Sequence, residues 1–421
     1  MNKKIKFSQK KLALFLLTGI GLIYLILFIS PNSSSSEGGS VFSIFSNDEY
    51  ITYPYVEKML TPGKDIHATW GNLIIYGDYH YGYPFYFLSM LVLLPRRIIL
   101  GEVFFTQRTT NIFILRMCIN VIPMLLTAGS MVYYKTRFRN ALKSVVLFIL
   151  LLSIPSVVRS NIWWWHPDSL TLLFIALTFL FLQLDDYQIG KYFYWAAVMC
   201  GLAVATKLLG FFFFLTIPVY LIISARKNKK PWHEIIANAF AFIIIMVVVI
   251  VLVNPFLWYE IPRNEMLAIQ QFKASELRQG YTHDDPYYYQ KGPQFWDWTI
   301  RTWFGTPVFI GFLIISLLAG LFGKKDFNEN IYLATWSLPF LFYALYFVAP
   351  KPDHYILPAL LPLFLTVFNL PDLLRALKKN KLQRIALVLT ILLVGFFLLR
   401  QFTFSIPKDI QLVQQYLIQN L

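Results

Sequence analysis

Charged residues are scarce in this chain. Of its 421 residues, 14% are charged and 57% are hydrophobic. A single soluble globule of this length cannot hide so much apolar surface, so the composition excludes that class and indicates a polytopic membrane protein. Cysteine is scarce too. Cys118 and Cys200 fall inside apolar runs at no metal-ligand spacing, which favours buried small hydrophobic side chains over a metal site.

Acidic residues are fewer than basic ones. The chain has 22 Asp and Glu against 37 Lys and Arg, a net charge of +15. The basic residues form short clusters between apolar runs, as cytoplasmic loops do, and we therefore expect no nucleic acid partner. A convincing small-residue cleavage site is also lacking after Leu12–Ser30, so we expect this first run to be a retained span.

The basic clusters orient the predicted spans. The lysines before residue 12 are expected to stay in the cytoplasm, and four later clusters share that side if there are about eleven spans. These clusters are Lys135–Lys143, Arg226–Lys230, Lys324–Lys325 and Arg375–Arg384. The expected spans lie near residues 12–30, 110–134, 144–158, 169–184, 192–209, 211–225, 235–253, 303–322, 331–348, 355–370 and 385–402. The predicted fold is a single all-α transmembrane domain over residues 1–421.

Two long external loops follow from this assignment, residues 31–109 and 254–302. The first contains Tyr83–Leu94, an apolar run that is short for a span and ends in Pro95-Arg96-Arg97. Counting it as a span would invert every later basic loop. We therefore predict that Tyr83–Leu100 lies along the outer membrane surface.

Polar residues gather in four external segments, where chemistry is expected because ionisable groups at membrane depth usually line a cavity. These segments are Asn47–Pro84, Arg159–Asp168, Asn254–Arg301 and Lys351–Tyr355. Each also has a simpler interpretation. Asp48 and Glu49 could be a solvated pair, the Trp163–Trp165 run an interfacial belt, and His166 with Asp168 a helix cap. For Lys207 and His354, membrane-surface and phosphate contacts compete evenly.

The order of these motifs resembles the GT-C class of membrane glycosyltransferases, and most closely the branch of protein O-mannosyltransferases and the aminoarabinose transferase of lipid A. Five short motifs carry the resemblance: Asp48-Glu49-Tyr50, His80-Tyr81-Gly82-Tyr83-Pro84, His166-Pro167-Asp168, Ala205-Thr206-Lys207 and His354-Tyr355-Ile356-Leu357-Pro358. Two departures from the family pattern leave the identity of the acceptor open. Leu208 and Leu209 separate Lys207 from the following glycine, and the C-terminal part is short for the large external domain of some members.

The resemblance implies an inverting transfer of a sugar from a polyprenyl-phosphate donor. Asp48, with Glu49 beside it, is then the catalytic candidate, because a general base must remove the acceptor proton. Lys207, Arg263, Arg301 and His354 are the candidates for the departing donor phosphate. The candidates for substrate contact are His80, Tyr83, Trp165, His166, Asp168 and Tyr355. A divalent metal could be held near Asp48, Asp168 and His166, but at no recognisable ligand spacing.

Other functions stay open from the sequence. A lipid-linked sugar flippase would also be polytopic and basic, although its charges should line a mid-membrane path. An O-antigen-type polymerase is a nearer alternative. The expected partners are membrane lipids, the lipid-linked donor, and a protein, lipid or glycan acceptor. Short loops favour a bacterial inner membrane, with the site on its external face.

Overall fold

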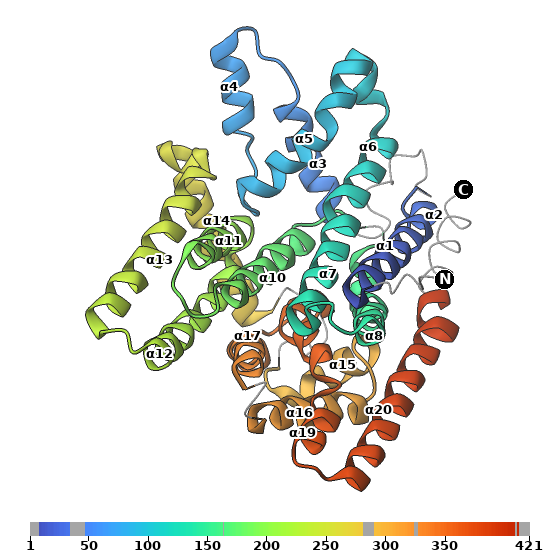
Figure 1. Cartoon of the computed structure of the whole chain (residues 1–421). Helices are drawn as coiled ribbons and strands as arrows, with labels where there is room; N and C mark the ends of the chain where they lie inside the picture. The colour runs from blue at the N-terminus through green and yellow to red at the C-terminus, as the bar shows by residue number, and fades with distance from the viewer. Residues whose placement is uncertain are drawn as a thin grey trace, which may run out of the picture.

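The computed structural model describes residues 8–33, 47–162, 164–280, 290–323, 327–408 and 411. Within these ranges the chain forms helices and turns and contains no strand. Figure 1 shows long helices side by side, with α3, α4 and α5 at one end of the molecule. The expected all-α class is confirmed for the described residues.

Seven helical stretches in the described ranges are long and apolar enough to cross a membrane. Two are single helices, α10 (Asp168–Asp185) and α13 (Trp232–Leu252). The other five join neighbouring helices: α1 (Gln9–Leu27) with α2 (Ile29–Ser33); α6 (Arg108–Leu115) and the π-helical turn η2 (Arg116–Val121) with α7 (Ile122–Thr136); η3 (Leu208–Leu215) with α12 (Thr216–Asn228); α18 (Asp353–Leu360) and η7 (Leu361–Thr366) with α19 (Asn369–Ala376); and α20 (Asn380–Arg400) with η8 (Gln401–Ser405). The chain is an integral membrane protein.

Four expected spans are helical but deviate from a simple crossing. α8 (Ala141–Leu152) has 12 residues and stops before Pro155, which starts α9 (Pro155–Ser160), and α11 (Lys191–Thr206) has 16 residues. η6 (Pro293–Trp296) and α15 (Asp297–Trp303) meet α16 (Pro307–Phe322) at 103°. α17 (Phe327–Phe347) is long enough, but Tyr, Trp and Asn residues lower its mean hydropathy. The count of about eleven spans is therefore not confirmed.

The first predicted external loop contains α3 (Asn47–Met59), α4 (Ile66–Ile74), α5 (Tyr83–Leu100) and the short η1 (Gly101–Thr106). α5 has the bounds of the predicted surface stretch and is not among the candidate spans. Pro84 at its first turn and Gly101 after its last residue explain these bounds, since proline suits a helix start and Gly101 adopts a positive φ of 56°. Its position along a membrane surface stays a prediction.

The second predicted external loop packs back onto the first. It contains η4 (Pro255–Trp258), α14 (Glu260–Gln279), η6 and α15. From α14, Gln270 donates to the carbonyl oxygen of Tyr79 at 3.3 Å, and Lys273 Nζ donates to that of His80 at 2.7 Å. These contacts bring the His80 segment and α14 together.

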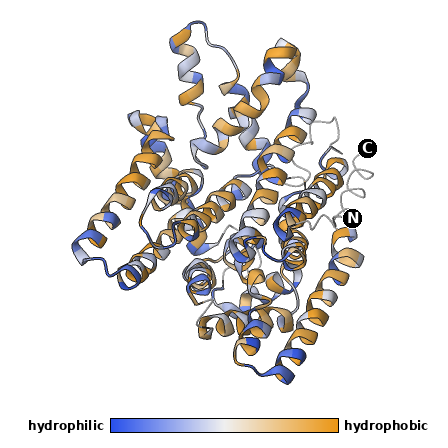
Figure 2. Ribbon diagram, in the orientation of Figure 1, coloured by the Kyte–Doolittle hydropathy of each residue, from blue (hydrophilic) through white to orange (hydrophobic). Residues whose placement is uncertain are grey.

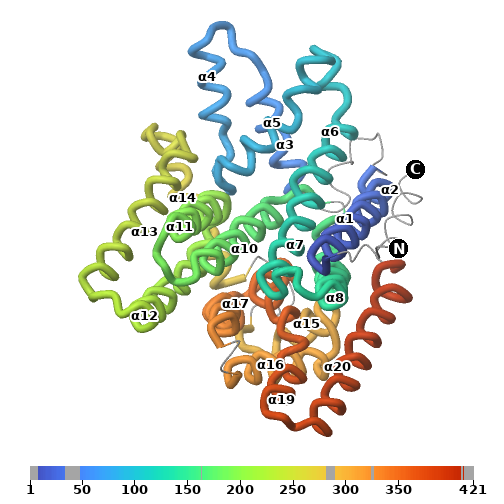
Figure 3. The backbone as a smooth tube through the Cα atoms, in the orientation of Figure 1, coloured from blue at the N-terminus to red at the C-terminus, as the bar shows by residue number. Residues whose placement is uncertain are grey.

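α10 lies at the centre of the main hydrophobic core, between α7 and α11, as Figure 3 shows. Leu172, Ile175, Phe179 and Leu182 recur at helical spacing along it and are buried. A second core lies under α3 and α5 and is rich in aromatic side chains, including the fully buried Trp165. The two cores meet near the start of α10, which positions the segment before it.

Three basic clusters lie at the end of the molecule opposite α4 and α5. Lys143 Nζ lies 2.6 Å from Asp372 Oδ2, Lys135 lies 3.7 Å from Glu329, and Lys227 lies 2.8 Å from Asp186. Figure 2 shows the α12–α13 and α19–α20 turns as hydrophilic at this end. Lys324 and Lys325 lie outside the described residues. The predicted orientation requires these basic clusters to lie at one end of the molecule. That this end faces the cytoplasm stays a prediction.

Candidate functional site

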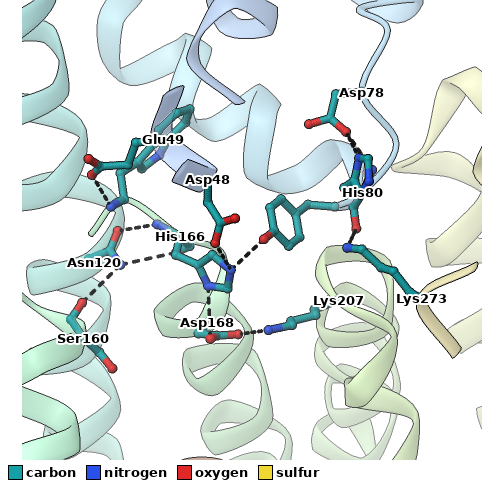
Figure 4. A network of polar contacts seen from close by, with 12 residues as sticks. Asp48, Glu49, Asp78, His80, Asn120, Ser160, His166, Asp168, Lys207 and Lys273 are labelled. Carbon is teal, nitrogen blue, oxygen red and sulfur yellow. Dashed lines mark hydrogen bonds and ion pairs between the residues drawn. The ribbon is translucent and has the colours of Figure 1, made fainter. Parts of the chain in front are cut away.

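The segment before α10 carries the centre of the site, and a π-helical turn holds it. Asn120 in η2 receives a hydrogen bond from the backbone N–H of His166 at 3.3 Å and donates to the His166 and Ser160 carbonyl oxygens. A π-turn re-aims side chains within a helix and is common at functional sites. His166 and Asp168 are thereby fixed at the start of α10, as Figure 4 shows.

Asp48, His166 and Asp168 form a line of ionisable groups. His166 Nδ1 lies 3.0 Å from Asp168 Oδ2, and its Nε2 lies 3.8 Å from Asp48 Oδ2. The first contact lacks full hydrogen-bond geometry, but a carboxylate can only accept, so we assign the proton to Nδ1. The Nε2 atom then accepts from the Tyr81 hydroxyl at 2.8 Å.

Burial lowers the pKa of His166, and Lys207 lowers it further, against the opposing effect of Asp168. The imidazole is therefore neutral at pH 7. Among the described residues, no group of three or more His, Cys, Asp or Glu side chains is arranged to hold a metal ion.

Two lysines lie near these groups. Lys207 Nζ lies 2.5 Å from Asp168 Oδ1. Lys273 Nζ donates to the His80 carbonyl oxygen at 2.7 Å and lies 4.5 Å from the ring centre of Tyr81, the residue whose hydroxyl contacts His166. Partial burial, followed by repulsion from Lys207, lowers the pKa of Lys273 to about 8. Two cations beside two acids give a nearly neutral group that can accept an added phosphate.

Aromatic rings surround the imidazole of His166. Trp164 stacks on it with ring centres 4.0 Å apart and planes at 17°. His354 lies 4.8 Å from Trp164 and 5.9 Å from His166, and Tyr355 packs edge-on against His354. Flat, partly exposed rings of this kind suit the apolar faces of a sugar. The site thus combines charged groups with surfaces for stacking.

Glu49 is adjacent to Asp48 but points into the protein. Its carboxylate receives two hydrogen bonds from Arg116, at 2.8 and 2.6 Å, and one from the backbone N–H of Trp165 at 2.6 Å. Glu49 and Arg116 are both fully buried. An acid so fully hydrogen-bonded anchors the start of α3 to η2 and to the Trp165 segment, and thereby positions Asp48.

The His80 segment forms a wall of the site. His80 Nδ1 lies 2.6 Å from Asp78 Oδ1, and Asp78 also accepts from the Tyr86 hydroxyl. These hydrogen bonds lower the pKa of Asp78 despite its burial, which acts in the opposite direction. Tyr83 stacks on Phe87 within the second core. Trp165 is fully buried there, stacks on Phe85 and donates to Ser89.

The structure brings together Asp48, His166, Asp168, Lys207, His354 and Tyr355. It does not bring Arg263 or Arg301 to them. Arg263 contacts the Leu257 carbonyl oxygen at 3.4 Å, and Arg301 forms an exposed ion pair with Asp297 one turn away on α15. Neither arginine contacts that group within the described part of the chain.

Comparisons with known proteins identify the fold. Residues 103–251 match the model of the family described as dolichyl-phosphate-mannose-protein mannosyltransferase. The solved structure of ArnT from Cupriavidus metallidurans bound to undecaprenyl phosphate is similar, with a TM-score of 0.52 and 14% identity over 96% of this chain and 75% of that one. This is the GT-C fold. The resemblance seen in the sequence is therefore confirmed.

A second solved structure is matched over a smaller share of its own length. The archaeal oligosaccharyltransferase AglB from Archaeoglobus fulgidus, in complex with an inhibitory peptide and a dolichol-phosphate, has a TM-score of 0.52 and 14% identity. The match covers 91% of this chain and 56% of AglB. No curated protein matches the chain. The region matched by the family model contains His166, Asp168 and Lys207. Asp48 and His354 lie outside it.

Sequence reasoning missed two residues near Asp48 and His166. Arg116 lies inside an apolar span, where a charged side chain is costly without a partner, and this cost was the available signal. Lys273 lies on an otherwise ordinary polar helix, and no local pattern separates it from other lysines. Only the packing of α14 against the His80 segment brings it to the site.

Proposed function

We propose that the chain is an inverting glycosyltransferase that moves a sugar from a polyprenyl-phosphate donor to an acceptor hydroxyl. One observation carries the proposal: Asp48, whose side chain is 44% exposed, lies beside His166, and both His166 and Lys207 contact Asp168. A reachable carboxylate suits a general base, and cations beyond it suit a departing phosphate.

The reaction is a single displacement. The acceptor oxygen attacks the anomeric carbon while its proton passes to the Asp48 carboxylate. The bond between that carbon and the phosphate oxygen breaks, and its electron pair leaves with the phosphate. Asp48 loses one negative charge as the phosphate gains one, so the total charge of the site is conserved. Cations beside the phosphate therefore stabilise the transition state more than the ground state.

The cationic role falls to Lys207 and Lys273, with His354 as a further contact to the phosphate. Asp168 aligns both Lys207 and His166, so we assign it a positioning role. Glu49 positions Asp48 through its ion pair with Arg116. Arg263 and Arg301 are left out of the donor site because their contacts lie elsewhere.

Substrate contacts follow from the surfaces near Asp48. Trp164 and Tyr355 offer ring faces for the sugar, while Tyr81 and His80 line the side toward α14. Tyr83 and Trp165 support this wall from the second core. The solved neighbours support the donor class, because one binds undecaprenyl phosphate and the other a dolichol-phosphate.

The acceptor is proposed as a hydroxyl of a protein, lipid or glycan on the external face of a bacterial inner membrane. The test incubates purified protein with radiolabelled polyprenyl-phosphate sugars and membrane extracts. Transfer of label by the natural protein, lost in Asp48→Asn and retained in Asp186→Asn, is expected. Movement of the intact lipid-linked sugar across vesicles without transfer would contradict the proposal and favour a flippase.

A further inference from the structure

A shallow groove lies where α13 meets α14, away from the Asp48 group. It has a volume of about 500 Å³ and is lined by Val251, Leu257, Trp258, Arg263, Met266 and Leu267. Five of these six side chains are apolar or aromatic, and the sixth is a guanidinium. We call this hollow the Arg263 groove.

The charge in the Arg263 groove has no acidic partner. Arg263 forms no ion pair with any described residue, and its hydrogen bond goes to the Leu257 carbonyl oxygen at 3.4 Å. Arg263 is exposed and lines the groove beside apolar walls. Arginine binds phosphate well in this setting, because its planar fork can donate two parallel hydrogen bonds.

An exposed apolar ridge leads to the groove along α13. Ile236, Phe240, Ile244, Val248 and Leu252 recur every four residues, and each is between 46% and 62% exposed. Successive side chains at this spacing are neighbours on the helix surface, so they form a continuous row that winds slowly around α13. Figure 2 shows α13 as largely hydrophobic, and only 17% of its most apolar window is buried by the protein. This ridge is suited to contact acyl chains.

Aromatic side chains mark the end of the ridge. Trp258 is 67% exposed and Tyr259 is 46% exposed, directly after α13 ends. Such rings settle at the depth of lipid headgroups. An acyl chain lying on the ridge would therefore bring its phosphate to the level of Arg263.

We propose that the Arg263 groove is a binding site for an anionic phospholipid of the surrounding bilayer. One acyl chain packs on Val251, Leu257 and Leu267, and the phosphate accepts hydrogen bonds from Arg263. The lipid is distinct from the glycosyl donor. Arg263 and Lys273 lie ten residues apart on α14, about 15 Å along the helix, and only Lys273 lies beside the acids used in transfer.

The test measures lipid retention by native mass spectrometry after extraction from nanodiscs of dioleoyl phosphatidylglycerol or dioleoyl phosphatidylcholine. The natural protein should retain phosphatidylglycerol preferentially. Arg263→Gln should reduce that retention by roughly tenfold, since one charge-assisted contact is lost. Arg301→Gln is the matched control, because Arg301 is also exposed but is paired with Asp297.

Leu267→Trp provides a second variant. It fills the groove while leaving Arg263 in place, so it should displace a lipid that uses the apolar walls. Glycerol 1-phosphate, which lacks acyl chains, should not compete. Equal retention of both lipids, equal losses in Arg263→Gln and Arg301→Gln, or competition by glycerol phosphate would each overturn the proposal.

A donor-lipid site is a further outcome of the same experiment. If undecaprenyl phosphate displaces phosphatidylglycerol and Arg263→Gln raises the donor KM in vesicles of phosphatidylcholine alone, the groove belongs to the donor and the proposal fails. The retention measurement needs no sugar transfer. Its result is therefore independent of the proposed glycosyltransferase activity.

Discussion

The two ends of α10 each carry a buried aspartate, and they use it differently. Asp185 accepts from the backbone N–H groups of Ile189 and Gly190 at 2.7 and 2.8 Å, and from the Tyr220 hydroxyl. Asp168 lies instead beside the side chains of Lys207 and His166. α10 has 18 residues, so the two acids lie about 25 Å apart along one rigid element.

The difference separates a structural carboxylate from one for which we propose a role in transfer. Backbone donors that close a turn cannot leave without unfolding it, so Asp185 stabilises the α10–α11 connection. A lysine side chain can exchange one anionic partner for another at little cost. Lys207 can therefore keep its contact with Asp168 or share it with a bound phosphate, which makes the Asp168 end suited to chemistry.

The largest effect is expected for the acid that lies closest to the acceptor in the proposed reaction. Asp48→Asn keeps size and hydrogen bonding but removes the proton acceptor, so turnover should fall by about two orders of magnitude or more. Donor binding should persist. Steady-state transfer assays with a donor-binding measurement check this, and Asp186→Asn at the opposite end is the control. Near-normal transfer by folded Asp48→Asn protein would refute the base assignment.

Lys207→Met should lower kcat/KM for the donor by roughly 10- to 100-fold, because one charge-assisted contact to the phosphate disappears. Lys207→Arg should keep part of the activity, since the charge survives while the geometry changes. Lys227 pairs with exposed Asp186 at the other end, so Lys227→Met should leave the kinetics unchanged. Equal losses in both methionine variants would show that the site does not depend on Lys207 itself.

Asparagine replacements at both ends of α10 test the comparison directly. Asp168→Asn should lower turnover by about tenfold to a hundredfold with a small change in melting temperature, as for residues that orient a functional group. Asp185→Asn should reduce the free energy of unfolding by about 1.5 to 3 kcal/mol, because its backbone donors lose a charged acceptor. Transfer per folded molecule should then stay normal. A large loss of stability in Asp168→Asn, together with a large loss of turnover in Asp185→Asn, would instead make Asp168 the structural residue and Asp185 the functional one.

The smallest effect concerns pH. The pKa of Lys273 is lowered to about 8, so this ammonium is charged below that pH and neutral above it. If its charge helps to bind the donor phosphate, kcat/KM for the donor should fall several-fold between pH 7 and pH 9. Lys273→Arg stays charged throughout this range and should remove the decline. A decline that persists unchanged in Lys273→Arg would assign the titration to another group.

Several features of the site were predictable because local chemistry marks them. Asp48, His166 and Asp168 are acids and an imidazole in segments between apolar runs, and His354 follows a proline-rich break. Their motif order pointed to the GT-C fold, which the comparisons confirm. The stretch Tyr83–Leu100, predicted from an apolar run closed by Pro95-Arg96-Arg97, has the same bounds as α5.

Other features could not be predicted from neighbours in the chain. Glu49 and Asp48 are adjacent in sequence, yet a helix turns successive side chains by about 100°, so one can enter the core while the other faces the site. The partner that makes Glu49 structural, Arg116, is 67 residues away. The predicted count of about eleven spans is not confirmed, because α15 and α16 are bent by 103° and α8 has only 12 residues.

The sequence by itself determined that this chain is a helical membrane protein with its polar chemistry confined to a few segments. Hydrophobicity and charge act through composition and local order, so they can be read along the chain. Only the tertiary structure decided which charges share a site. Lys273 joins Lys207 because α14 packs on the His80 segment, and Arg263 on the same helix faces an apolar groove. These pairings depend on helix rotation and long-range contacts, which no local pattern specifies.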